Sequence, residues 1–187
     1  LLLQEMANYA DSAVCRRKQL LHYFGETFER DCGFCDNCKH PKERFEAKNE
    51  VLLALKAVVQ TEERFGLDHI GTVLMGMNNP HVESYGHDKL PVYGQGKDHD
   101  AQFWHSLLRQ SLLNGLLEKD IENFGVIRIT QKGLDFIDNP YSIKLTKDHN
   151  YEEEVKEEQE QEEVQQAAGH DEALFDMLKA LRKKIAQ

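Results

Sequence analysis

The sequence contains no apolar run of about 20 residues, the length that a helix needs to cross a bilayer. It also lacks the G-x-x-x-x-G-K-[ST] phosphate loop, whose backbone amides and lysine hold a nucleoside triphosphate. The acidic string DEAL at residues 171–174 follows a polar segment and not a buried strand, so we assign it no role. These absences predict that the chain does not span a membrane and that, alone, it neither hydrolyses ATP nor holds the Mg²⁺ that hydrolysis requires.

Net charge is a weak guide to the binding partner of this chain. The 33 Asp and Glu residues outnumber the 23 Lys and Arg residues, which gives a formal net charge of −10. Residues 150–166 hold eight Glu and one Lys, a net charge of −7, so the other residues carry only −3. Because the acidity belongs mainly to one segment, it does not exclude nucleic-acid binding by the rest of the chain.

Cysteine is scarce, but the four cysteines are spaced as metal ligands. Cys15, Cys32, Cys35 and Cys38 form the pattern C-x₁₆-C-x₂-C-x₂-C. Two intervening residues allow a turn to bring both sulfur atoms to one ion, and Gly33 relaxes the backbone there. Two disulfides or four free thiols are the alternatives, but nothing resembles a signal peptide leading to an oxidising compartment. Because four thiolates leave no position for water, the pattern predicts one structural Zn²⁺ ion.

Residues 1–45 are predicted to form a helical module around this metal site. Its second helical run is CRRKQLLHYFGE, with Leu20, Leu21 and Phe24 as the inner face. The basic triplet at residues 16–18 is either a solvated face beside the thiolates or a phosphate contact. Since the module has little apolar core, metal binding is expected to supply much of its folding free energy.

Residues 46–140 are predicted to form a winged helix. Periodicity and turn signals predict helices at 49–60, 67–75 and 101–114, strands at 116–121 and 126–130, and a last helix at 131–138. Three helices followed by a hairpin are typical of this fold, in which the hairpin is the wing. Many winged helices bind DNA through a helix in the major groove, whereas others bind only protein, so the pattern alone leaves both functions open.

The predicted fold class is therefore mainly α with a small β component: a helical zinc-binding module followed by a winged helix with a β-hairpin wing. Residues 141–170 are polar and Glu/Gln-rich, and we expect them to form a flexible acidic linker. Residues 171–187 are predicted to form an amphipathic helix, the first of a truncated domain. Its apolar face comprises Leu174, Leu178, Leu181 and Ile185.

Candidate DNA contacts gather in the loop before the third helix of the winged helix. Phosphate groups are bound by Lys, Arg, His and small amide side chains. The candidates of these types in the loop are Asn78, Asn79, His81, His87, Lys89, Lys97 and His99. Their alternative role is to hold the loop together, and His87 in YGHDK is the strongest candidate for it.

Further candidates lie on the wing and on the third helix. Phe124 and Arg128 are predicted wing contacts, and Arg109 is either a phosphate contact or a salt-bridge partner. Phe103, Trp104 and Tyr85 are predicted to be core residues and not base-stacking platforms, because they share spacing with apolar neighbours.

Several strings of this sequence together resemble the region of RecQ-family DNA helicases that follows the two motor domains. They are CRRKQLLHYFGE, CGFCDNC, RFGLDHI, YGHDKLPVYGQGKD, FWHSLLRQSLLNGLL and DEALFDMLKALRKKIA, the last similar to the start of a helicase-and-RNase-D C-terminal domain. They agree in order and distance over nearly all of residues 1–138 and over residues 171–187. The resemblance implies a fragment of an ATP-dependent 3′-to-5′ DNA helicase, because the chain begins within a pattern and its last domain stops after one helix.

The resemblance also implies roles for the two modules. The zinc ligands would be the four cysteines, and the winged helix would grip duplex or forked DNA near the unwinding junction in repair and recombination. The wing tip at residues 123–125 is short, as in bacterial members of the family. Motor domains in cis would supply the ATP and Mg²⁺ sites, a single-strand-binding protein is a further candidate partner, and the location would be the bacterial cytoplasm, at the nucleoid.

Two other functions remain open at this point. A zinc-containing winged-helix transcription regulator would need sequence-specific base contacts and usually a dimer interface, and the sequence offers no obvious dimerisation helix. A protein-interaction module that uses the acidic segment would have no DNA affinity once that segment is removed.

Overall fold

A computed structural model describes residues 2–26, 28, 30–120, 123, 125–149 and 172–185. The chain divides into two compact units, residues 1–148 and residues 149–187. In the second unit the structure describes one helix, α10 (Glu172–Ile185), on which Leu178, Leu181 and Ile185 are exposed. Among the described residues, no helix is both long enough and apolar enough to span a membrane.

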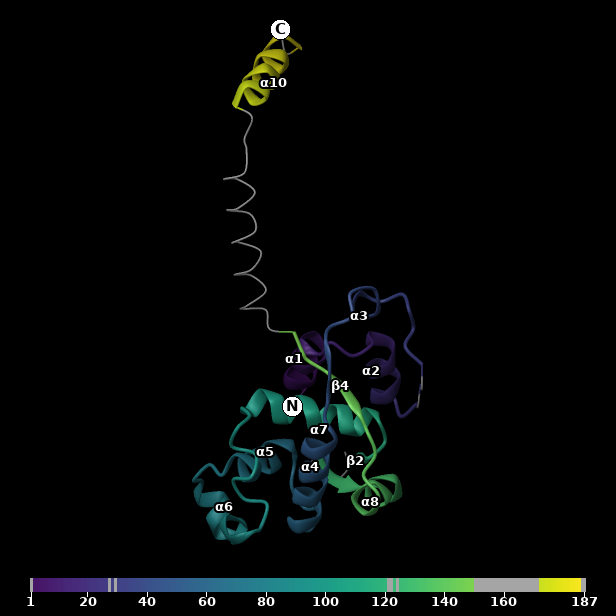
Figure 1. Ribbon diagram of the computed structural model, residues 1–187, viewed down its shortest axis with the longest axis vertical. Helices are drawn as coiled ribbons and strands as arrows, with labels where there is room; N and C mark the ends of the chain where they lie inside the picture. The colour runs from purple at the N-terminus through teal and green to yellow at the C-terminus, as the bar shows by residue number, and fades with distance from the viewer. Residues whose placement is uncertain are drawn as a thin grey trace. The chain divides into compact units, whose positions relative to one another are not determined.

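The first unit is mainly helical with small antiparallel sheets, which confirms the predicted fold class (Figure 1). Its N-terminal part holds α1 (Leu2–Asp11), α2 (Arg16–Tyr23) and α3 (Asp36–Lys39). The remaining elements, in chain order, are β1 (Arg44–Glu46), α4 (Lys48–Gln60), α5 (Leu67–Met75), α6 (Pro80–Ser84), the 3₁₀ turn η1 (His87–Lys89), α7 (Ala101–Leu113), β2 (Leu117–Asp120), β3 (Val126–Ile129), α8 (Gln131–Asp138) and β4 (Lys144–Thr146).

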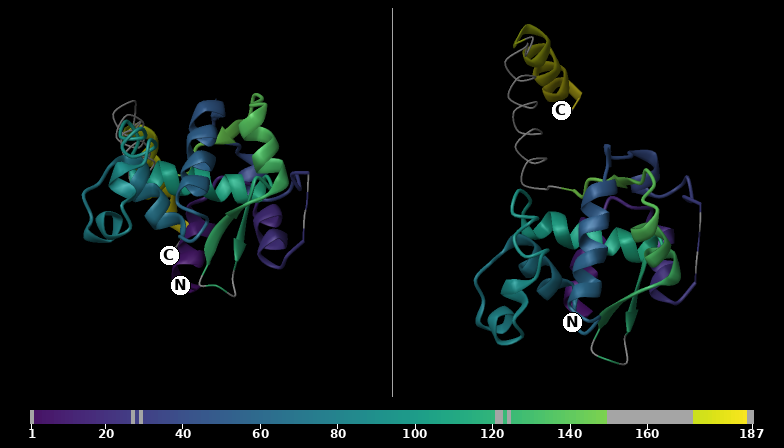
Figure 2. Two further views of the ribbon diagram at one scale, coloured as in Figure 1. Left: turned by 90° about the horizontal axis from the view of Figure 1, so that it is seen from below. Right: turned by 60° about the horizontal axis from the view of Figure 1, so that its bottom comes forward.

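The elements from α4 to α8 are arranged as a winged helix. Helices α4, α5 and α7 pack against one another, and α8 packs against α4. Strands β2 and β3 pair antiparallel with Leu117 opposite Ile129 and Asp120 opposite Val126. Figure 2 shows this hairpin projecting beyond the helices, in the position of a wing.

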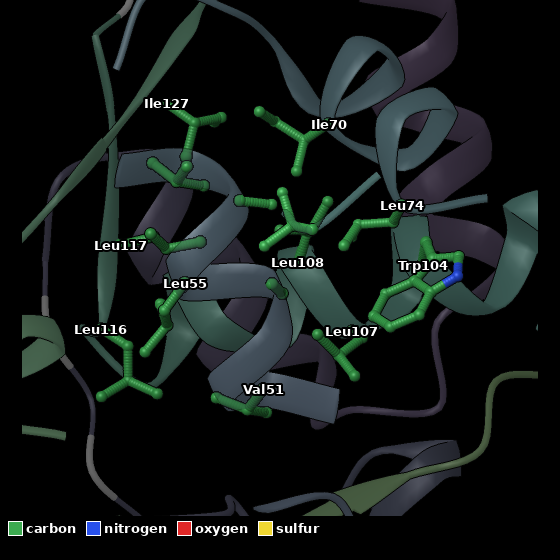
Figure 3. Close-up of a cluster of buried hydrophobic side chains, with 14 of the residues drawn as sticks. Val51, Leu55, Ile70, Leu74, Trp104, Leu107, Leu108, Leu116, Leu117 and Ile127 are labelled. Carbon is green, nitrogen blue, oxygen red and sulfur yellow. The ribbon is translucent and has the colours of Figure 1, made fainter. Parts of the chain in front are cut away.

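One apolar core joins these helices to the hairpin (Figure 3). It includes Val51 and Leu55 of α4, Ile70 and Leu74 of α5, Leu107 and Leu108 of α7, and Leu117 and Ile127 of the hairpin. Trp104 is fully buried, and its indole N–H donates a hydrogen bond to the carbonyl oxygen of Gly96 at 2.9 Å, as a buried indole requires. A Cβ atom on Gly96 would lie 2.3 Å from the Trp104 ring, so only glycine fits there. Trp104 therefore has the core role that the sequence predicts.

Two short strands that sequence analysis missed close the winged helix. Strands β1 and β4 pair antiparallel, with Arg44 opposite Thr146, and Leu145 of β4 is buried in the core. The side chain of buried Gln110 in α7 donates to the Thr146 carbonyl oxygen at 2.7 Å and accepts from its N–H at 2.9 Å. The segment expected to be a flexible linker therefore begins with a strand of the folded unit, whereas residues 150–170 lie outside the described residues.

Helix α2 differs from the prediction. Leu20 and Phe24, expected to face inward, are 50% and 70% exposed, and no residue of α2 is fully buried. The helix contacts α7 instead. Burial there lowers the pKa of His22, although a hydrogen bond with the Leu112 backbone opposes this shift.

Arg109 connects α7 with both ends of the first unit. Its guanidinium donates to the carbonyl oxygen of Asn8 in α1 at 3.1 Å and to the carboxylate of Asp148 at 2.5 Å. The two side chains of this ion pair are only 17% and 6% exposed. Burial raises the pKa of Asp148, and the Arg109 charge opposes that rise. Of the two roles that the sequence left open for Arg109, the structure shows the salt bridge.

We predict that Arg109→Ala lowers the free energy of unfolding at pH 7.5 by about 3 kcal/mol, because it leaves the Asp148 carboxylate buried without its cation. The deficit should shrink as the pH is lowered towards 5. Without the Arg109 charge, the pKa of Asp148 in the folded variant rises further above its value in the unfolded chain. As the pH falls, the folded variant therefore takes up a proton before the unfolded chain does, and this uptake restores stability. Urea unfolding of the zinc-loaded chain, followed by circular dichroism, measures both effects.

Arg64→Ala is the matched control for this prediction. Arg64 forms an ion pair with Glu62 at 3.2 Å in which both side chains are highly exposed, so its removal should cost less than about 1 kcal/mol. Equal losses in the two variants would contradict the stabilising role assigned to Arg109.

Candidate metal centre and nucleic-acid interface

The sulfur atoms of Cys15, Cys32, Cys35 and Cys38 converge on one point, with all four within 4.8 Å of one another. Cys15 directly precedes α2, and the other three lie on the turn that leads into α3 and within α3 itself. The sulfur atoms of Cys32 and Cys38 are 3.9 Å apart, close to the separation of about 3.8 Å that two thiolates have on a tetrahedral zinc ion. All four cysteines are free, so the disulfide alternative is excluded.

Backbone amides favour negative charge on part of this site. The N–H of Cys32 donates to Sγ of Cys15 at 3.3 Å, and the N–H of Cys35 donates to Sγ of Cys32 at 3.4 Å. Hydrogen bonds from the backbone of Phe34 and of Cys35 lower the pKa of Cys32 to about 6, whereas burial raises the pKa of Cys38 to about 12. Four thiols this close ionise together only with a cation among them. The donor set therefore fits one structural zinc ion, bound by four thiolates with no position left for water.

Polar contacts around the cysteines join the segment that leads into α2 to helix α3. The guanidinium of Arg16 pairs with Asp36 at 3.0 Å, which lowers the pKa of that carboxyl group, and it donates to the carbonyl oxygen of Ser12 at 3.1 Å. The buried amide of Asn37 donates to the carbonyl oxygens of Ser12 and Val14, both at 2.8 Å. Arg16, the first residue of the basic triplet, is thus held by the zinc module.

The loop between α5 and α7 carries the seven predicted phosphate contacts of that region. Five of them are exposed: Asn78, Asn79, His81, Lys89 and Lys97. Asn79 also caps α6, because its side-chain oxygen accepts a hydrogen bond from the N–H of His81 at 2.9 Å. The ring of His99 is partly buried and stacks on Phe103, with ring centroids 3.8 Å apart.

His87 is buried, which agrees with the structural role suspected for it. Its Nδ1 lies 2.8 Å from Nε2 of His69, a residue that sequence analysis did not single out. The sequence offered one clue to this contact, because His69 belongs to the string RFGLDHI, which precedes YGHDK in the chain. Tyr85 was predicted to be a core residue, but its side chain is 58% exposed beside these rings.

The cations of the wing have acidic partners. Arg128 on β3 pairs with Asp120 on β2 at 2.8 Å, and Lys119 pairs with Glu5 of α1. Arg128 stays about half exposed and thus available to a ligand that competes with Asp120. Phe124, the other predicted wing contact, lies outside the described residues.

Helix α7 follows α5 as a recognition helix would, but most of its surface is covered. It packs against α5, α4, β2 and α2. Its buried residues are Trp104, Ser106, Leu107, Leu108, Gln110, Ser111 and Leu112. Its exposed residues are Ala101 and Gln102 in the first turn, and the others are partly buried. The expectation that a helix enters the major groove therefore does not suit α7 beyond this turn.

Comparison with known proteins identifies two family models in this chain. Residues 2–39 match the RecQ zinc-binding model, and residues 41–154 match the RQC domain model. The chain is similar to three proteins called ATP-dependent DNA helicase RecQ. That of Pasteurella multocida is 29% identical over 189 residues (100% of this chain and 29% of that protein), that of Haemophilus influenzae is 28% identical over 185 residues (98% and 30%), and that of Bacillus subtilis is 24% identical over 186 residues (98% and 29%). The chain spans less than a third of the length of these relatives.

We predict that Cys35→Ser removes zinc from the protein and unfolds the module of α1–α3, while the winged helix stays folded. The module buries few apolar side chains, so it depends on the metal, whereas the winged helix has its own core. The zinc content of the purified protein, measured by mass spectrometry, should fall from one ion per chain to nearly none. Fluorescence of Trp104 should still report a folded winged helix.

Phe34→Ala is the control for the cysteine variant. Phe34 lies on the same turn but is 83% exposed, so zinc content and melting temperature should stay close to those of the parent chain. Full zinc content and an unchanged melting curve in Cys35→Ser would refute the four-thiolate site.

Proposed function

This chain belongs to the RQC-domain family, and on that premise we propose that it is the DNA-binding platform of an ATP-dependent 3′-to-5′ RecQ-like helicase. The observation that supports this most is the succession of a RecQ zinc-binding match and an RQC match over residues 2–154. The platform would grip duplex DNA next to the unwinding junction in repair and recombination. Motor domains in the same polypeptide would hydrolyse ATP, so we infer that this chain alone is not an enzyme.

We propose that the DNA surface is the loop between α5 and α7, together with the wing. Lys89 and Lys97 are exposed and, within the part of the chain that the structure describes, form no ion pair with an acidic side chain. Arg128 of the wing instead pairs with an acidic neighbour. A cation that has no protein partner can bind phosphate without first giving up an ion pair, so the loop is the better candidate for strong contacts.

The covered surface of α7 bears on the rival function of a transcription regulator. Such a regulator reads base edges with several side chains of one helix lying in the major groove. Only the first turn of α7 is available for this purpose. Contacts from a loop and a wing suit recognition of DNA backbone and shape, which a helicase needs, better than recognition of a sequence.

For the domain boundaries, we propose a zinc module at residues 1–45 and a winged helix at residues 46–140, to which β1 and β4 add a closing pair of strands. The partners we propose are duplex or forked DNA, motor domains in cis and a single-strand-binding protein. A helicase of this kind would act in the bacterial cytoplasm, at the nucleoid.

The test is the affinity of the zinc-loaded 187-residue chain for a labelled forked duplex and a blunt duplex, measured by fluorescence anisotropy across a salt series. We expect binding that weakens as salt rises, with a slope of about −0.9 in log K against log [salt] for each phosphate contacted, and a preference for the fork. A Lys89→Ala/Lys97→Ala double variant should lose about two contacts and flatten the slope by roughly 1.8.

Lys144→Ala serves as the control, because Lys144 is also exposed but lies on β4, opposite Glu46 and outside the loop. Its salt slope should match that of the parent chain. Binding that does not respond to salt, or equal losses in the control and the double variant, would count against the proposed DNA surface.

A further inference from the structure

Three histidines from three elements meet beside the proposed DNA surface. His69 lies on α5, His81 on α6 and His87 on η1. Nδ1 of His81 is 3.3 Å from Nδ1 of His69, and Nε2 of His69 is 2.8 Å from Nδ1 of His87. Both ring nitrogens of His69 therefore face another imidazole. We refer to these three residues as the histidine relay, which runs from exposed His81 to buried His87.

Two aromatic rings pack against the relay. Phe65 stacks on His69 with ring centroids 4.0 Å apart and an interplanar angle of 20°. Tyr85 lies edge-on to His81, at 5.0 Å between centroids. Burial, followed by the charges of His87 and His81, lowers the pKa of His69 to about 4. His69 is therefore neutral at physiological pH, with one N–H and one lone pair.

A neutral His69 allows only two arrangements of protons along the relay. In the outward arrangement, His69 donates from Nδ1 to His81 and accepts at Nε2 from His87. In the inward arrangement, His81 donates to Nδ1 of His69, and Nε2 of His69 donates to Nδ1 of His87. A charged His81 carries a proton on both nitrogens, so it is compatible with the inward arrangement alone.

Charged groups act on the buried end of the relay. Burial lowers the pKa of His87, and the charge of His81 acts in the same direction. The carboxylates of Glu62, after α4, and Asp88, on η1, oppose this shift. The inward arrangement places the remaining N–H of His87 on Nε2. Tyr85 also faces the cluster, because its ring contacts those of His81 and His87.

We propose that His81 is a proton-linked phosphate contact: when DNA docks on the loop, His81 takes up one proton from solvent at Nε2, and His69 and His87 accept the matching inward arrangement. The proposal rests on the proposed function, since the phosphate is that of bound DNA. Only an N–H bond forms, and its proton comes from water or buffer. The phosphate charge pairs with the new imidazolium, while its Nδ1–H remains bonded to His69.

The first experiment measures the dissociation constant of the full chain for the forked duplex between about pH 6.0 and 7.5 at fixed salt. In the parent chain the constant should rise with pH by roughly 5- to 10-fold, in accord with uptake of up to one proton on binding. In His81→Gln, which keeps a polar side chain that cannot ionise, the rise should be less than about twofold. His105→Gln removes a histidine on α7 that pairs with Asp68 outside the relay, and it should keep the parent profile.

The second experiment reports on the relay itself. Nitrogen-15 NMR of the histidine rings in the DNA complex at pH 6.5 should show His69 and His87 each protonated at Nε2 and free of a proton at Nδ1. A proton at Nδ1 of either ring in the complex would overturn the relay.

The two proposals fail in different ways. Binding by the parent chain that is absent, or insensitive to salt, at every pH would overturn both the DNA platform and the relay. Salt-sensitive binding with the same pH profile in the parent chain and in His81→Gln would overturn the relay alone, as would equal losses in His81→Gln and His105→Gln. A second zinc ion per chain that is lost in His81→Gln would also overturn it, because a metal would then hold the ring nitrogens.

Discussion

The convergence of four sulfur atoms on one point takes the place of a hydrophobic core in the zinc module. Among the described residues before β1, the only buried apolar side chains are those of Ala13 and Cys15. Ordering each backbone residue costs about 1–2 kcal/mol, which so few buried side chains do not offset. The free energy of metal binding must supply the difference. The contacts of Arg16 and Asn37 come second, because they join segments that the sulfur atoms have already brought together.

The zinc module also covers part of the winged helix. Helix α2 packs against α7, and Arg109 of α7 reaches the backbone of α1, so the zinc module adds to the cover that α4, α5 and β2 place over α7. The loop from α5 to α7 and the wing are left as the open polar surface. This arrangement suits the proposed DNA-binding platform, because the covered helix contributes rigidity and the loop contributes the charge.

Local patterns in the sequence predicted the metal site and the main helices of the winged helix. The cysteine spacing pointed to the four residues whose sulfur atoms converge, and the 3.6-residue periodicity identified α4, α5 and α7 and placed Trp104 in the core. Strands β1 and β4 were not predicted, because three residues are too few to show alternation. Their pairing also joins segments that lie far apart in the sequence. Leu20 and Phe24 were misplaced because periodicity marks an apolar face without showing what covers it. The contact of His69 with His81 and His87 could not be foreseen, since it depends on how α6 and η1 fold back onto α5.

The pairing of β1 with β4 also determines how the unit responds to mechanical load. The chain enters β1 at Arg44 and leaves β4 at Thr146, and these residues lie opposite each other at the same end of the ladder. Tension between the segment before β1 and the segment after β4 therefore pulls the ladder open from that end. Its hydrogen bonds break one after another and are not all sheared at once. The first contacts to be strained are the Arg109–Asp148 ion pair, the Lys147–Glu43 ion pair at 2.6 Å and the bonds of Gln110 to Thr146. Arg109 and Gln110 both lie on α7, so part of the load reaches the helical core through α7 while the strand pair opens.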